Sequence, residues 1–149
     1  MEFTAAQDYA IRMVLYLSCI LLSKGKIIAS REEICQQMGI PKAFLAKLAQ
    51  FLEKKGILAI KRGKNGGYLL VKNPAEISLL EVVEAFEGPI TFARCFVKKE
   101  QCNRISFCPV NKVLQEINQC FREKLSSYTF DKLAKAELML YQEKQQEKR

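Results

Sequence analysis

The sequence predicts a mainly α-helical fold that carries one small β-hairpin. Apolar residues recur at helical spacing through most of the chain. Two short β-rich runs flank a glycine-rich turn, and capping residues and glycines mark where helices begin and end. The chain has 149 residues, 49% of them hydrophobic, which is enough for one domain with a real core plus an appendage.

The first forty residues predict two helices. Thr4 can cap a helix that reaches about Leu22, because the apolar residues between them share one face. Ser30 can cap a second helix, with Glu33 at the capping-box position. Gly39 supplies the left-handed residue that ends this second helix.

A third helix is expected from Pro41, which suits a first turn, to about Lys55, and Gly56 ends it. One face is apolar and the other is basic, so we expect the apolar face to pack on the first two helices. This expected buried face consists of Phe44, Leu45, Leu48, Phe51 and Leu52.

A β-hairpin is expected next, because ILAI (57–60) and YLLV (68–71) flank KRGKNGG (61–67). Asn-Gly and Gly-Gly permit positive φ, as a tight turn between paired strands requires. A fourth helix follows from Ser78 to Glu87, and Gly-Pro ends it.

A long helix is predicted from Pro109, broken at residues 127–129, before a final helix whose tail (141–149) we expect to be frayed. We expect the apolar stripe on the long helix to be a dimer seam, with an ordinary core helix as the alternative. The stripe consists of Val110, Val113, Leu114, Ile117, Phe121 and Leu125, with Cys120 alongside.

The order helix, helix, turn, helix, hairpin is that of a winged helix-turn-helix, in which the third helix enters a DNA major groove. A formal charge of +8 favours a polyanionic partner, although a merely soluble basic protein has the same sign. An RNA-binding or protein-docking winged helix is the main alternative. The candidate DNA-binding residues are Lys42, Ala43, Lys47, Lys61, Arg62, Lys64, Asn65 and Gly66.

Three of the six cysteines, Cys95, Cys102 and Cys108, lie within fourteen residues. No secretory signal or membrane span is evident, so we expect a cytoplasmic protein with reduced cysteines and no membrane partner. The spacing C-x6-C-x5-C matches neither zinc ribbons nor ferredoxins and leaves the metal open. Nearby cations would favour either thiolate ligation or a reactive redox thiol. These cations are Arg94, Lys98, Lys99 and Arg104.

The remaining cysteines, Cys19, Cys35 and Cys120, occupy apolar positions of predicted helices, so we expect them to be buried structural thiols. An enzyme, such as a thiol oxidoreductase, is disfavoured. The chain has no histidine base, no C-x-x-C in a βαβ context and no nucleotide-binding loop.

Several stretches together resemble the iron–sulfur cluster regulator family of bacterial winged-helix transcription factors (IscR- and NsrR-like). They are FTAAQDYAIRMVLYL, IPKAFLAKLAQFLEKKGIL, RGKNGGYLL and ISLLEVVEAFEG, followed by the three cysteines. The resemblance covers nearly the whole chain. It implies a DNA-binding domain (1–90), a cluster-binding loop (91–108) and a dimerisation helix with a helical tail (109–149). It also implies a homodimer on a palindromic operator.

The resemblance further implies that Cys95, Cys102 and Cys108 hold a 2Fe–2S or 4Fe–4S cluster. IscR-type members have a histidine where this chain has Asn111, and with no histidine present an imidazole ligand is excluded. The fourth ligand is left open. Asp8 is a candidate, because NsrR-like members have an aspartate in a matching stretch, and a small thiol, water or a backbone-held group could also serve. The alternative role for Asp8 is to complement the dipole of the first helix.

The expected function is therefore cluster-controlled transcription regulation, with iron–sulfur cluster biogenesis genes as the targets. Two alternatives stay open. One is a repressor that responds to nitric oxide or iron, and the other is a cluster-free thiol switch in which the three clustered cysteines oxidise.

Overall fold

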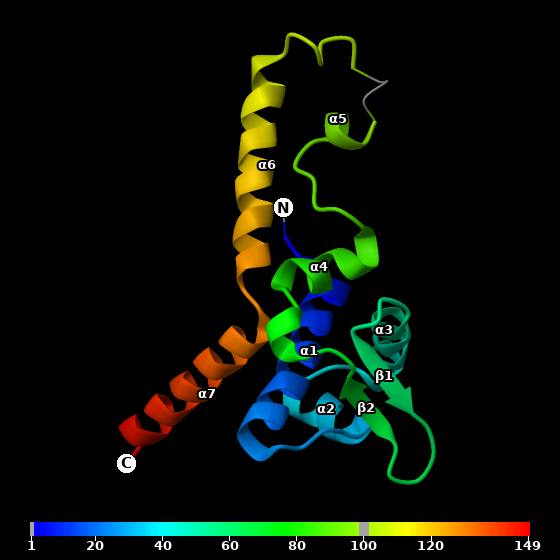
Figure 1. Cartoon of the computed structure of the whole chain (residues 1–149), viewed down its shortest axis with the longest axis vertical. Helices are drawn as coiled ribbons and strands as arrows, with labels where there is room; N and C mark the ends of the chain where they lie inside the picture. The colour runs from blue at the N-terminus through cyan, green and yellow to red at the C-terminus, as the bar shows by residue number, and fades with distance from the viewer. Residues whose placement is uncertain (1, 99–101) are drawn as a thin grey trace.

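The structure is a computed structural model that describes residues 2–98 and 102–149. It confirms a mainly helical fold with a two-stranded antiparallel hairpin. The elements are α1 (Ala5–Lys24), α2 (Arg31–Met38), α3 (Lys42–Lys54), β1 (Leu58–Lys61), β2 (Gly67–Leu70), η1 (Pro74–Glu76), α4 (Leu79–Glu87), α5 (Arg94–Val97), α6 (Pro109–Ser127) and α7 (Phe130–Glu147). Figure 1 shows α1–α4 and the hairpin gathered in one body, from which α6 projects with α5 beside its far end.

The helix starts are set by the residues that the sequence indicates. Thr4 forms a complete capping box with Gln7 at the start of α1. The hydroxyl of Ser30 accepts a hydrogen bond from the backbone N–H of Glu33 at 3.2 Å. The Glu33 side chain does not close a capping box, because it accepts hydrogen bonds from Tyr16 (2.6 Å) and Lys26 instead. Its carboxylate thus ties α1 to the start of α2.

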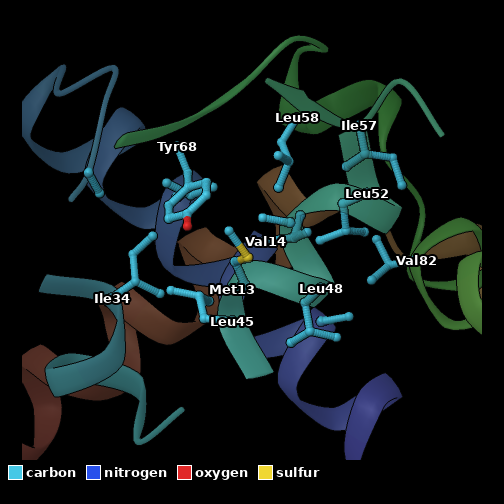
Figure 2. Close-up of a cluster of buried hydrophobic side chains, with 14 of the residues drawn as sticks. Met13, Val14, Ile34, Leu45, Leu48, Leu52, Ile57, Leu58, Tyr68 and Val82 are labelled. Atoms are coloured by element: carbon cyan, nitrogen blue, oxygen red, sulfur yellow. The ribbon is translucent and has the colours of Figure 1, made fainter. Parts of the chain in front are cut away.

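The core lies among α1, α2, α3, the hairpin and α4, as Figure 2 shows. Among the described residues, α1 is the one helix long and apolar enough to cross a membrane by length and composition. Core packing accounts for this apolarity, since Met13 and Val14 are fully buried and Leu17 is 2% exposed.

The hairpin, residues 58–70, is the wing. Leu58 pairs with Leu70 at its base and Lys61 with Gly67 at its tip. Tyr68 docks the wing on the body, because it exchanges backbone hydrogen bonds of 2.8 and 3.0 Å with Ala29. A Cβ on Gly67 would overlap the Ala29 carbonyl oxygen, so glycine is required for this approach.

Helix α7 returns from α6 to the body. Phe130 and Ala134 are fully buried, and the Phe130 N–H donates to the carbonyl of Ile77 at 2.9 Å. The end of α7 is solvent-exposed but helical through Glu147, so the expectation of a frayed tail is wrong. Its lysine and glutamate residues are good helix formers, which explains why the pattern continues without tertiary contacts.

Residues 91–108, the cysteine connector, contain structure that apolar periodicity did not predict. They include the single turn α5 and a further turn before α6. One of the four cations expected beside the cysteines, Lys99, lies outside the described residues.

Candidate nucleic-acid interface and cysteine site

Helix α3 exposes its polar face as predicted. Lys42, Ala43 and Lys47 are exposed near its N-terminal end, whereas Leu45 and Leu48 are at most 2% exposed. The apolar face therefore fixes the helix while its first two turns stay free to meet a groove.

One expected core residue of α3 is exposed, and another, Phe44, is half-buried. Phe51 is 39% exposed and contacts Phe86 of α4, with ring centroids 5.3 Å apart. Phe51 therefore connects α3, which is the recognition helix of the helix-turn-helix motif, to α4. The sequence pattern had indicated only that Phe51 packs in the core.

The tip of the wing presents three cations to solvent. Lys61, Arg62 and Lys64 are all exposed, as is Asn65, which adopts a left-handed φ of 66°. A Cβ on Gly66 would overlap the Lys61 carbonyl oxygen, so the turn needs glycine there. The tip can thus bring both positive charge and close backbone approach to a phosphate.

A groove that the sequence pattern did not predict lies between the start of α2 and the tip half of the wing. Ser30, Arg31 and Glu32 form one wall, and the wing forms the other. The pKa of Glu32 is lowered, mainly because its carboxylate accepts a hydrogen bond from a backbone N–H at the start of α2. The positive charges of Arg31 and Lys42 lower this pKa further. In the sequence, the available signal for this groove was Arg31, the cation directly after the capping residue Ser30. Arg31 lies where a DNA phosphate could meet helix and wing together.

Two of the three clustered cysteines meet at the start of α6. Cys108 is the N-cap of α6, and its sulfur accepts the backbone N–H of Asn111 at 3.4 Å. The side-chain nitrogen of Asn111 lies 3.2 Å from the sulfur of Cys95 on α5. Asn111 thus contacts both sulfurs.

Cys102 is half-buried but does not join this pair. Within residues 2–98 and 102–149, no three Cys, His, Asp or Glu side chains surround a point that could hold a metal ion. The chemistry of the donor set nevertheless fits an iron–sulfur cluster, because three thiol side chains belong to one short connector and two of them already contact one residue.

Asp8 lies in the first turn of α1, where its carboxylate pairs with Arg12 at 2.7 Å. Arg12 also donates to the carbonyl of Met38 at 3.1 Å, at the end of α2. Asp8 is half-exposed. Through Arg12 it is connected to the end of α2 in the helix-turn-helix.

The other three cysteines are not all buried. Cys120 is exposed on α6, which corrects its expected burial, while Cys19 and Cys35 are half-buried. Burial, followed by the nearby carboxylate of Glu137, raises the pKa of Cys19 to about 12, so this thiol stays protonated. Burial likewise raises the pKa of Cys35.

Contacts link the connector to the DNA-binding body. Phe92 packs edge-on against Phe121 of α6, with centroids 5.3 Å apart. Glu84 of α4 forms an ion pair with Arg122 of α6 and accepts the backbone N–H of Ile90 at 2.8 Å. Because α4 also touches α3 through the Phe51–Phe86 contact, the connector and the recognition helix share one neighbour.

A helix-turn-helix with a basic wing, fixed to a projecting helix, is the architecture of the winged-helix class of DNA-binding proteins. The Rrf2 family model, described as an iron-dependent transcriptional regulator, matches residues 3–136. The chain therefore belongs to the Rrf2 family of transcription regulators.

Two curated relatives are similar over most of their length. Protein aau3 of Rhizobium meliloti (strain 1021) is 34% identical over 137 residues, covering 91% of this chain and 86% of the relative. An rrf2-like HTH-type transcriptional regulator of Rhodobacter capsulatus is 29% identical over 138 residues, covering 89% and 92%.

Solved structures share the fold at lower identity. T. potens IscR matches with a TM-score of 0.72 and 21% identity, covering 91% of this chain and 88% of that one. CymR, the global cysteine regulator of B. subtilis, matches with a TM-score of 0.72 and 22% identity, covering 91% and 98%. The same fold therefore occurs in an IscR and in a cysteine regulator.

Proposed function

We propose that this protein is a homodimeric transcription regulator whose operator binding is controlled by an iron–sulfur cluster on Cys95, Cys102 and Cys108. Genes for cluster assembly are the proposed targets. The observation that carries the proposal is the contact of the Cys95 and Cys108 sulfurs with Asn111, at the start of the helix that joins the connector to the body.

The proposed cluster would give the connector a centre that depends on iron and is sensitive to oxidation. Binding it requires Cys102 to join the other two cysteines. Movement of the connector reaches α6 through Phe92 and Phe121, and reaches α4 through Ile90 and Glu84. The position of each recognition helix in the dimer then depends on the state of the connector.

On the DNA side, Lys42, Ala43 and Lys47 are proposed to face the major groove. The wing tip is proposed to meet the backbone and the adjacent minor groove through Lys61, Arg62, Lys64, Asn65 and Gly66. The exposure of these side chains and of the wing tip supports this assignment.

The homodimer is proposed to form along α6. Val110, Val113 and Ile117 are 61%, 53% and 49% exposed on one edge of the helix. Leu114 and Phe121, on the adjacent edge, are half-buried by the chain itself. An exposed apolar stripe of this spacing supports a helix–helix interface with a second copy, which would place two recognition helices on a palindromic operator.

The deciding experiment compares operator binding by anaerobically reconstituted protein with binding by a Cys95, Cys102, Cys108 triple-alanine variant. We expect the affinity or the site preference to differ by at least about tenfold, the equivalent of ~1.4 kcal/mol. Equal affinity and site preference would reject cluster control.

Substituting Lys61 with alanine should weaken binding to DNA and reduce the salt dependence of binding, since fewer counterions are released.

A cluster-free thiol switch is the second candidate, favoured by the two sulfurs that contact one side chain. Protein purified without oxygen separates the candidates. Visible absorption with iron and sulfide in the protein supports the cluster, whereas colourless protein that gains a Cys95–Cys108 disulfide on treatment with peroxide supports the switch.

A repressor that responds to nitric oxide or iron is a variant of the first proposal, with Asp8 as the fourth ligand. Release of Asp8 from Arg12 would then accompany binding, and Asp8→Asn should change the reaction of the holoprotein with nitric oxide. A cytoplasmic location and the lack of a membrane partner stay expectations of the sequence.

A further inference from the structure

The residue that contacts both cysteine sulfurs is the buried residue of α6. Asn111 is 5% exposed, whereas the other residues of α6 are half-buried or exposed. A buried amide needs partners for both its NH₂ group and its oxygen. In Asn111 the nitrogen faces Cys95 at 3.2 Å, and the oxygen accepts from the side-chain amide of Gln115 at 2.8 Å.

This arrangement fixes which end of the amide meets the sulfur. Because the oxygen of Asn111 is engaged by Gln115 one turn along α6, the NH₂ group is directed at Cys95. An amide NH₂ group has no lone pair for a metal, but it donates to a thiolate. The backbone N–H of the same residue donates to Cys108 at 3.4 Å, so both contacts are donations to sulfur.

We propose that Asn111 is a positioning residue for the cysteine site: it holds Cys95 and Cys108 together by donating a hydrogen bond to each sulfur, and does not itself act as a ligand. Gln115 keeps the Asn111 amide in the donating orientation. The effect on a bound cluster rests on the function proposed above, whereas the pairing of the two cysteines does not.

Two consequences follow for the loaded protein. Hydrogen bonds to ligating sulfur stabilise added negative charge, so Asn111 raises the reduction potential of the cluster. Groups that orient metal ligands also strengthen binding, and their loss typically weakens it by about 10- to 100-fold. Asn111→Asp keeps the shape of the side chain but replaces the donor with an acceptor, so it should lower both the potential and the retention of iron.

The experiment uses the full-length protein, reconstituted anaerobically with iron and sulfide, as wild type, Asn111→Asp, Asn111→Leu and Gln115→Leu. We expect full iron and sulfide content in each, a lower potential in both Asn111 variants, and at least about tenfold faster loss of iron to a chelator. Gln115→Leu should shift both quantities in the same direction by less. Asn103→Asp, in the exposed turn beside Cys102, controls for added charge near the cluster and should leave iron loss unchanged.

A second measurement on cluster-free protein keeps the two hypotheses separate. Dibromobimane joins thiols that lie close together, and we expect it to link Cys95 to Cys108 in preference to pairs with Cys102. The yield should fall severalfold in Asn111→Leu. Circular dichroism checks that the variant is folded.

The outcomes are distinct. If wild type takes up no iron and sulfide but the Cys95–Cys108 link depends on Asn111, the cluster proposal fails and the pairing by Asn111 stands. If wild type binds the cluster, but potential, iron loss and cross-linking are the same in the Asn111 variants, the positioning role is rejected. Faster iron loss in Asn111→Asp that is absent from Asn111→Leu and equalled by Asn103→Asp would also reject it, because added charge would then account for the effect.

Discussion

At the scale of single residues, polar side chains connect the helices of the DNA-binding body at defined points. Glu33 accepts hydrogen bonds from Tyr16 at 2.6 Å and from Lys26. Burial of Tyr16, then its contact with the Glu33 carboxylate, raises the pKa of the phenol to about 12. One carboxylate therefore joins α1, the following loop and α2.

This pKa predicts how stability changes at high pH. Because the pKa of Tyr16 is raised from 10.0 to about 12 by folding, its contribution is complete below pH 10 and is lost as the pH rises towards 12. Tyr16→Phe should lower the free energy of unfolding by about 1 kcal/mol at neutral pH. Urea denaturation from pH 8 to 12 should show this difference shrinking. A difference that stays constant across the range would contradict the assignment.

A single glycine determines whether the wing can dock. A Cβ on Gly67 would meet the Ala29 carbonyl, and the backbone φ of +154° adds strain. Gly67→Ala should cost at least about 2 kcal/mol of stability and weaken DNA binding, because the Ala29–Tyr68 hydrogen bonds are lost.

Gly63→Ala is the matched control for the wing prediction. Its Cβ meets nothing within 4 Å, and only its φ of +97° is unfavourable. We expect a loss of about 1 kcal/mol, with the wing still docked. Equal losses in the two variants, by urea denaturation, would show that the approach to Ala29 does not matter.

At the scale of elements, α4 connects the two halves of the molecule. It touches α3 through Phe86 and Phe51, and touches α6 through Glu84 and Arg122. The Glu84 and Arg122 side chains are 18% and 29% exposed, so this ion pair is better shielded from solvent than a surface pair. Under the proposed function, helix α4 is the candidate route by which the connector would act on α3.

Glu84→Gln tests this route. The neutral amide can still accept the N–H of Ile90, but it loses the ion pair with Arg122, at a cost of about 1–2 kcal/mol. We expect the ratio of operator affinities between cluster-loaded and cluster-free protein to move towards one. The measurement is an anaerobic DNA titration of both forms.

Glu81→Gln is the control for this prediction. Glu81 also lies on α4, but its partner Lys72 precedes that helix and does not belong to α6. The ratio of affinities should be unchanged in this variant. A wild-type ratio in Glu84→Gln would mean that coupling does not pass through this ion pair.

At the scale of the whole molecule, the DNA-binding elements and the cysteine connector lie at opposite ends, and α6 spans the distance between them (Figure 1). The exposed edge of α6 is the proposed dimer interface. A charge there would oppose burial of the stripe in a helix–helix interface, because an unpaired buried charge is costly.

Ile117→Glu should therefore convert the proposed dimer to a folded monomer that binds a palindromic operator at least about tenfold more weakly. Gln119→Glu, an equally charged change at an exposed position away from the apolar stripe, should leave the dimer intact. Sedimentation velocity measures both. A dimer that persists in Ile117→Glu would place the interface elsewhere.

Local chemistry made much of the fold predictable. Thr4, Ser30 and Ser78 cap the helices expected of them, and the Asn-Gly turn closes the expected hairpin. The candidate DNA-binding residues could be found because a helix that buries one face must expose the other. The groove beside Arg31 was not predicted, because it forms only where the wing folds back beside the start of α2.

The sequence by itself determined the order and type of the main elements, the basic tip of the wing and the clustering of three thiols, because capping, periodicity and composition act over a few residues. Tertiary structure alone decided that α7 packs on α1, that Glu84 meets Arg122, and that the Asn111 side chain contacts Cys95. The Asn111–Cys95 and Glu84–Arg122 contacts join residues 16 and 38 positions apart, and such pairings depend on how whole helices pack.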